Sequence, residues 1–240
     1  MAVESRGRFP WALTIASALV FALLITLGAW QVQRLQWKQG LIARAEAAAQ
    51  QPPVPIMDAF RPSEEFRRVV VDCPGLATAP FVELQTIENG RPGVRLISAC
   101  PLPTEPFVAL VDRGFVADAI SARPPVRPSQ EPVRIVAQLR NPPERSALAL
   151  PAEGKRFFWR DFGGMSEALG VRTWAARPML FALTSSNPEW LALEPSAPPA
   201  AFSNNHLGYA ITWFGLALAL AGVYVALLRR KLRDTPKSLS

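Results

Sequence analysis

The sequence predicts a membrane α+β protein in which two transmembrane helices form a hairpin and flank a sheet-rich domain. Two apolar runs and one alternating pattern predict this class. Residues 11–30 and 207–228 contain no charged side chain, and about 20 helical residues cross a bilayer core of roughly 30 Å. Between these runs, short apolar or alternating segments bounded by proline and glycine are typical of strands.

The first apolar run predicts an uncleaved membrane anchor. Arg6 and Arg8 precede it, as they would in a signal peptide, which is the alternative interpretation. However, the run is longer than the roughly 7–15 apolar residues of a signal peptide, and no small-x-small cleavage pattern ends it. Because only ten residues precede the run, we expect no arginine-rich transit peptide. The sequence therefore predicts a bacterial inner-membrane protein.

Basic residues near the second run predict the orientation of the chain. No lysine or arginine lies between Pro178 and Leu228, whereas five follow within residues 229–240. Since basic residues concentrate on the cytoplasmic side, we expect cytoplasmic tails at residues 1–10 and 229–240. With spans at residues 11–30 and 207–228, residues 31–206 would form a periplasmic domain.

The net charge of +7 does not indicate nucleic-acid binding. The two tails hold seven basic and two acidic residues, which leaves a net charge of only +2 for the other 218 residues. A nucleic-acid-binding domain would need a basic face. The excess charge instead predicts contact between the tails and the lipid bilayer, whose inner leaflet is anionic.

The region between the spans predicts one helical extension followed by an antiparallel sheet. Helix-forming residues continue to residue 50, and Pro52 and Pro53 end the helix. Six prolines between residues 124 and 143 flank one alternating strand, which predicts either a sheet edge or ordered turns. A short helix is expected at 164–169, and an extended tether at 187–199. The predicted strands are residues 66–71, 81–85, 94–100, 107–111, 133–139 and 179–183.

The motifs of common enzymes are absent from the sequence, and we expect no catalysis. There is one histidine, and no CxxC, HExxH or GxSxG motif occurs. Residues 161–163 spell the kinase tripeptide DFG, but no glycine-rich loop or HRD accompanies it. Cys73 and Cys100 each precede a proline; on the oxidising side of the membrane they form either a disulfide or two half-buried thiols.

Small residues line one entire face of the second apolar run. Such a face lets another helix approach closely. It packs either against the first span, through Thr14, Ala18, Ala22 and Ala29, or against a foreign membrane protein. The residues of this face are Gly208, Thr212, Gly215, Ala219 and Gly222.

The single histidine, His206, lies where the second span begins. Tyr209 and Trp213 follow at i+3 and i+7, so two aromatic rings share its helix face. A planar apolar cofactor with an axial nitrogen ligand would need such a site, although an aromatic belt at the membrane interface has the same composition. On the first helix, Arg34 and Lys38 could neutralise carboxylates such as haem propionates, or serve as interfacial anchors.

Three motifs resemble the signatures of the surfeit locus protein 1 family, in that family's order and at similar spacing. The third is the most specific, and the match extends from the first span through the second. The motifs are LGAWQVQR at 27–34 followed by Trp37 and Lys38, LVDRGFV at 110–116, and NNHLGYAITWF at 204–214.

The resemblance implies a two-span inner-membrane protein that assists assembly of haem-copper cytochrome oxidases. It implies that haem a is held transiently, with His206 as axial ligand of the haem iron, and is placed in the oxidase's first subunit. Enzymes of haem a synthesis are further expected partners. The rival hypothesis is a scaffold that holds oxidase subunits and binds no cofactor.

Overall fold

The structure is a computed structural model that describes residues 9–59, 65–102, 108–141, 149–171, 179–187, 189–196 and 204–233. Contacts divide the chain into a helix unit, within residues 1–43 and 202–240, and a sheet unit, within residues 44–201. Some predicted parts lie outside the described residues. These are residues 1–8 and 234–240 of the expected tails, Phe107 of a predicted strand, and the tether beyond residue 196.

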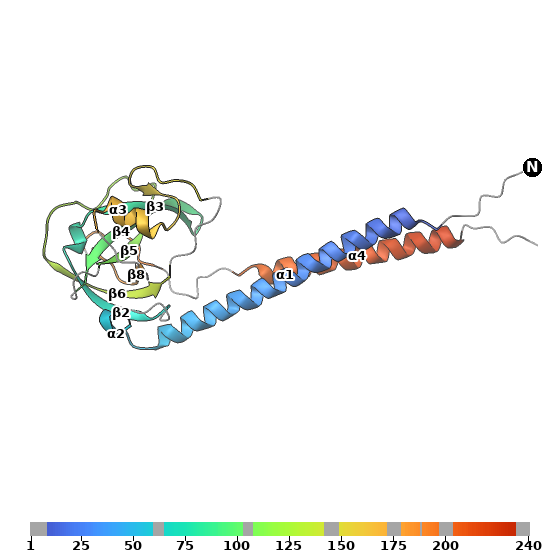
Figure 1. The fold of residues 1–240 in the computed structure, drawn as a ribbon, viewed down its shortest axis with the longest axis horizontal. Coiled ribbons are helices and arrows are strands. Elements are labelled where there is room, and N and C mark those ends of the chain that lie inside the picture. The colour runs from blue at the N-terminus through green and yellow to red at the C-terminus, as the bar shows by residue number, and fades with distance from the viewer. Residues whose placement is uncertain are drawn as a thin grey trace, which may run out of the picture. The chain divides into compact units, whose positions relative to one another are not determined.

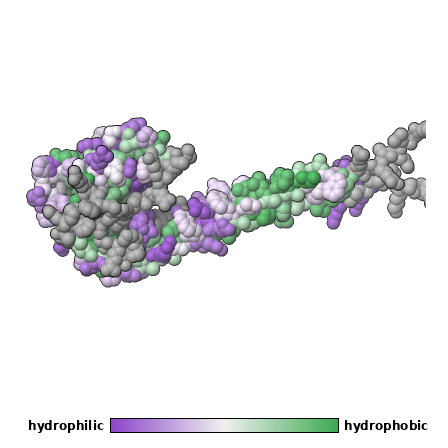
Figure 2. All heavy atoms as spheres, viewed as in Figure 1, coloured by the Kyte–Doolittle hydropathy of each residue, from purple (hydrophilic) through white to green (hydrophobic). Residues whose placement is uncertain are grey.

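The helix unit contains α4, His206–Arg233, and most of α1, Trp11–Gln50, whose residues 44–50 belong to the sheet unit. Both helices are long and apolar enough to cross a membrane. Apolar side chains cover the surface of both along much of their length (Figure 2). Thr14 of α1 contacts Tyr224 near the end of α4, whereas Gln31, further along α1, contacts His206 at the start of α4. The two helices are therefore antiparallel (Figure 1). The predicted helical hairpin is therefore present.

The first helix continues well beyond its apolar part, because residues 31–50 are mostly strong helix formers. It ends at Gln50, just before Pro52 and Pro53, which cannot continue the hydrogen-bonding pattern of a helix. The Arg68 guanidinium donates a hydrogen bond of 2.9 Å to the Ala49 carbonyl. That bond satisfies one of the carbonyls left without a partner at a helix C-terminus.

The sheet unit contains one eight-stranded sheet with short helices (Figure 1). Its strand order is β1-β2-β6-β8-β5-β4-β3-β7. The strands are β1 Val54–Pro55, β2 Arg68–Pro74, β3 Phe81–Glu88, β4 Arg91–Pro101, β5 Val108–Ala117, β6 Pro132–Arg140, β7 Arg156–Phe157 and β8 Met179–Ala182. The helices are α2 Ile56–Ala59, the 3₁₀ turn η1 Leu76–Thr78, and α3 Phe162–Ala168.

The six predicted strands are all present, but the sheet is mixed rather than antiparallel. The pairs β1–β2, β3–β7 and β5–β8 are parallel, whereas the longest ladders are antiparallel. Two of the parallel pairs involve the two-residue edge strands β1 and β7, which are too short to produce an alternating pattern. The third arises because a long connection separates β5 from β8.

The structure decides between the two alternatives for the proline-flanked strand and corrects the expected tether. Strand β6 lies between β2 and β8, so its flanking prolines mark the connections at its ends rather than a sheet edge. The expected tether at 187–199 is partly fixed on the sheet. Glu194 forms a bridge with Phe115, and the Leu193 side chain is 2% exposed, because it packs against Val94, Leu96 and Val116.

Cys73 and Cys100 form a disulfide whose Cα atoms are 5.2 Å apart. They lie on β2 and β4, which are not neighbours in the strand order, so the sheet curves until these two strands meet. Both cysteines are fully buried and belong to the largest core cluster, together with residues of β2, β5, β6 and β8. Of the two alternatives for these cysteines, the structure has the disulfide.

Removing this disulfide is expected to destabilise the sheet unit by about 3.5 kcal/mol, since the bond closes a loop with a sequence separation of 27 residues. The measurement is urea unfolding of the full chain and of the C73A/C100A variant in the same detergent. The chain has only two cysteines, so reductant added to the wild type acts on no other bond and provides the matched control. A difference below roughly 1 kcal/mol would contradict the expected contribution.

Candidate functional site

His206 is the first residue of α4 and is half-buried. Its Nδ1 lies 2.7 Å from Oε1 of Gln31 on α1. An amide oxygen only accepts hydrogen bonds, so Nδ1 is the N–H donor of this hydrogen bond and Gln31 Oε1 is its acceptor. In a neutral imidazole this leaves Nε2 with its lone pair, which is the form that binds a metal ion.

A close approach of the two helices holds this pair together. A Cβ atom added at Gly28, three residues before Gln31, would lie 2.6 Å from a ring carbon of Phe214. Only glycine leaves room for that ring. Around the contact, Gln31 is 9% exposed and Ala210 is 2% exposed, so the Gln31 side chain is enclosed between the helices.

The predicted aromatic and cationic residues lie near this pair along the helices. Tyr209 is exposed and Trp213 is half-buried, on successive turns after His206. Arg34 and Lys38 follow Gln31 at i+3 and i+7, so they share its helix face at about 4.5 and 10.5 Å along the axis. The Arg34 guanidinium lies 4.7 Å from the centre of the Trp37 ring, a cation–π contact that holds it beside an exposed aromatic surface.

The small-residue face of α4 does not pack against α1, and this interpretation of it is wrong. Among the described residues, a Cβ added at Gly208, Gly215 or Gly222 would meet no atom of another element within 4 Å, and Thr212 and Ala219 are also exposed. The helices instead meet on the opposite stripe of α4, which contains His206, Ala210, Phe214, Ala217 and Tyr224. The Phe214 ring, which packs over Gly28, makes the helix contact that was expected from small residues.

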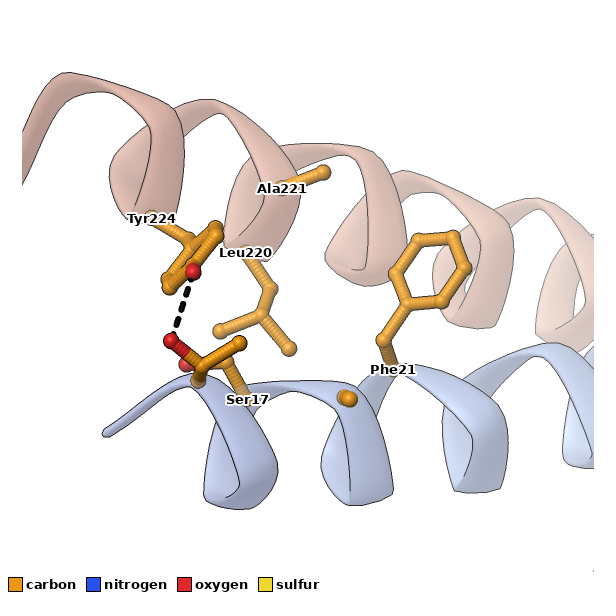
Figure 3. Close-up of a pocket in the computed structure, with 7 residues that line it drawn as sticks. Ser17, Phe21, Leu220, Ala221 and Tyr224 are labelled. Carbon is orange, nitrogen blue, oxygen red and sulfur yellow. Dashed lines mark hydrogen bonds between the residues drawn. The ribbon is translucent and has the colours of Figure 1, made fainter. Parts of the chain in front are cut away.

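The other end of the helix pair carries a second polar contact and a small cavity. The hydroxyl groups of Thr14 and Tyr224 are 2.8 Å apart. Beside them, Ser17, Phe21 and Leu220 help to line a cavity of about 270 Å³ (Figure 3). Of the residues on α1 that were expected to contact α4, Thr14 does so through Tyr224 and Ala18 lines the cavity, whereas Ala22 and Ala29 are exposed.

The residues around His206 fit a haem group with one protein axial ligand. The structure provides an imidazole oriented through its Nδ1, the aromatic rings of Tyr209 and Trp213, and cations for carboxylates. Two residues before His206, the buried Asn204 Oδ1 has no hydrogen-bond partner among the described residues. Such an orphaned acceptor is costly, and a donor on a bound molecule would satisfy it.

The second motif, residues 110–116, belongs to the framework of the sheet. Asp112 is fully buried, and its two carboxylate oxygens share a bifurcated hydrogen bond from the single N–H of Arg95 Nε. Although burial opposes ionisation of Arg95, the charges and hydrogen bonds of Asp112 and Glu88 raise its pKa above the ordinary value. Gly114 has a φ of 137°, and a Cβ there would lie 2.4 Å from the Glu194 carbonyl oxygen.

Arg113 in the same motif is also fully buried. It donates to the Ser186 hydroxyl at 2.9 Å and to the Ala77 carbonyl at 3.1 Å. Burial lowers its pKa to about 10. Because Arg113 bonds to residues from two other segments, its contacts indicate a role in joining loops of the sheet unit.

The part of the chain that the structure describes contains no group of three or more His, Cys, Asp or Glu side chains that could hold a metal ion. The DFG tripeptide has a structural role. The Asp161 side chain accepts a hydrogen bond from the Gly164 amide and caps α3.

Three residues central to this geometry received no role from the sequence: Gly28, Gln31 and Phe214. All three lie inside the motifs at 27–34 and 204–214. One local signal could have suggested Gln31, because it is a polar residue directly after an apolar span and on the same helix face as Arg34 and Lys38.

The sequence profile of the SURF1 family matches residues 18–218. A SURF1-like protein of Rickettsia felis is 27% identical over 213 residues, 86% of this chain and 92% of that protein. Surfeit locus protein 1 of Homo sapiens is 26% identical over 262 residues, which cover 97% and 81% of the two chains. The cytochrome oxidase assembly protein SHY1 of Saccharomyces cerevisiae is 28% identical over 159 residues, 60% of this chain and 41% of the yeast protein. Because the family profile matches most of the chain, this protein belongs to the SURF1 family.

Proposed function

We propose that this protein assists the assembly of a haem-copper cytochrome oxidase by holding haem a at His206 and helping to place it in the oxidase's first subunit. Membership of the SURF1 family and the name of the yeast relative support the assembly role. The observation that carries the haem proposal is the hydrogen bond between His206 Nδ1 and Gln31 Oε1, because it leaves Nε2 available to iron.

Haem a would supply an iron atom that accepts the Nε2 lone pair, together with two propionates. His206 binds the iron and Gln31 orients the imidazole. Tyr209 and Trp213 provide apolar surface beside the ring, while Arg34 and Lys38 neutralise the propionates. The proposed role requires no bond-breaking chemistry from these side chains.

We place the protein in a bacterial inner membrane with both ends in the cytoplasm and the sheet unit in the periplasm. The five basic residues after the second apolar run support this orientation. A disulfide in the sheet unit agrees with an oxidising compartment. Enzymes of haem a synthesis are proposed partners, because a carrier must receive the haem before it releases it.

A second candidate function is a scaffold that binds oxidase subunits without a cofactor. The observation that favours it is the open small-residue face of α4, where a Cβ added at Gly208, Gly215 or Gly222 would touch no other element that the structure describes. Such a face suits a second transmembrane helix. The two candidates differ in whether the protein itself binds haem a.

Deletion of the gene tests the assembly role. We expect membranes of the deletion strain to contain oxidase whose first subunit lacks most of its haem a, and we expect the wild-type gene to restore it. The measurement is the reduced-minus-oxidised spectrum of oxidase purified through a subunit other than the first. An oxidase with its full haem a content in the deletion strain would contradict both candidate functions.

A further inference from the structure

We propose that Gln31 is a positioning residue that selects the tautomer of His206 and tunes its bond to haem iron. The inference rests on the proposed function, because it assigns Gln31 a role toward the haem that His206 would bind. Its structural basis is the distance of 2.7 Å between Gln31 Oε1 and His206 Nδ1.

The direction of this hydrogen bond determines which ring nitrogen can bind metal. A neutral imidazole has one N–H donor and one lone pair. Because Oε1 accepts a hydrogen bond from the N–H at Nδ1, the lone pair of a neutral ring is on Nε2. Without Gln31, protonation at Nε2 would compete, and the ring could rotate away from the orientation that the acceptor enforces.

The surroundings of Gln31 keep it in place. It is 9% exposed and lies one helical turn after Gly28, where the Phe214 ring fills the space that a Cβ would occupy. The acceptor therefore comes from the other helix, 175 residues away in sequence. As a consequence, the orientation of His206 depends on the pairing of α1 with α4.

A buried acceptor on Nδ1 also changes the ligand electronically. It increases the basicity of Nε2, as hydrogen-bonded carboxylates and carbonyls do for other metal-binding histidines. A more basic axial ligand stabilises ferric over ferrous haem and lowers the reduction potential. Gln31 should therefore affect both the affinity for haem a and its potential.

The test titrates purified haem a into the full-length protein in detergent and then measures the reduction potential of each complex. For Q31L we expect the affinity to fall by about tenfold or more and the potential to rise. For Q31E, which keeps an acceptor, we expect an affinity close to that of the wild type and a lower potential. Q33L is the matched control, because Gln33 is exposed on the same helix and its loss should change neither quantity.

Three results separate the possible failures. If Q31L keeps the affinity and the potential of the wild type, Gln31 does not have the proposed role. The same holds if Q31E behaves like Q31L, because the acceptor oxygen at position 31 would then have no effect. If Q31L unfolds, the potential of Q31E still decides, since an unchanged value contradicts the proposal. Wild-type haem binding by H206A would instead remove the ligand assignment itself, and with it the proposed function of this site.

Discussion

Replacing His206 with alanine is expected to weaken haem a binding by at least about 100-fold, more than the loss of a residue that only orients a ligand. The substitution removes the nitrogen that would bind iron. The hydrogen bond to Gln31 is lost as well, but His206 is at the first turn of α4, so the helix should still form. Titration with haem a, followed by the Soret band, measures the affinity.

The control for this variant is N205A, since Asn205 precedes His206 and its side chain is exposed. N205A should bind haem a as the wild type does. Circular dichroism should give equal helix content for all three proteins. An H206A protein that keeps both the affinity and the absorption spectrum of the wild type would contradict the assignment of His206 as ligand.

Replacing Gly28 with leucine is expected to disrupt the site without touching His206. The new Cβ would lie 2.6–2.9 Å from three carbons of the Phe214 ring, so the ring or the helix must move. Overpacking of this kind costs about 1–3 kcal/mol, and it acts one turn from Gln31. We therefore expect the Gln31–His206 contact to break and haem a affinity to fall by roughly tenfold, as for the loss of Gln31 itself.

G215L provides the matched control, because a Cβ at Gly215 on α4 has nothing within 4 Å. This variant should bind haem a normally, since the helix pair remains intact. If the open face receives an oxidase helix, G215L should nevertheless lower the haem a content of the oxidase in cells. Equal haem a affinities for G28L and the wild type would contradict the importance of the close helix approach.

Much of the fold follows from local patterns in the sequence. The apolar run at 11–30 lies inside α1, and Pro52 and Pro53 mark the end of that helix. The alternation at 133–139 predicts β6, because a strand buried on one face repeats every two residues. These features depend on neighbouring residues, so they can be recognised without knowing the tertiary contacts.

The remaining features depend on residues far apart in the chain. The parallel pairing of β5 with β8 leaves no local pattern in either strand. Residue size alone predicts that the small-residue face packs either against the first span or against another membrane protein, but the contact between α1 and α4 forms where the Phe214 ring fits against Gly28. The contact between Gln31 and His206 could not be predicted, because the two residues are 175 positions apart in the sequence.

The most direct test of the central claim is the absorption spectrum of the wild-type protein purified from cells that make haem a. We expect a Soret band that H206A lacks, and a pyridine haemochrome spectrum that identifies the bound group as haem a. A protein purified from such cells without a Soret band, and unable to take up added haem a, would contradict the account and favour the cofactor-free scaffold.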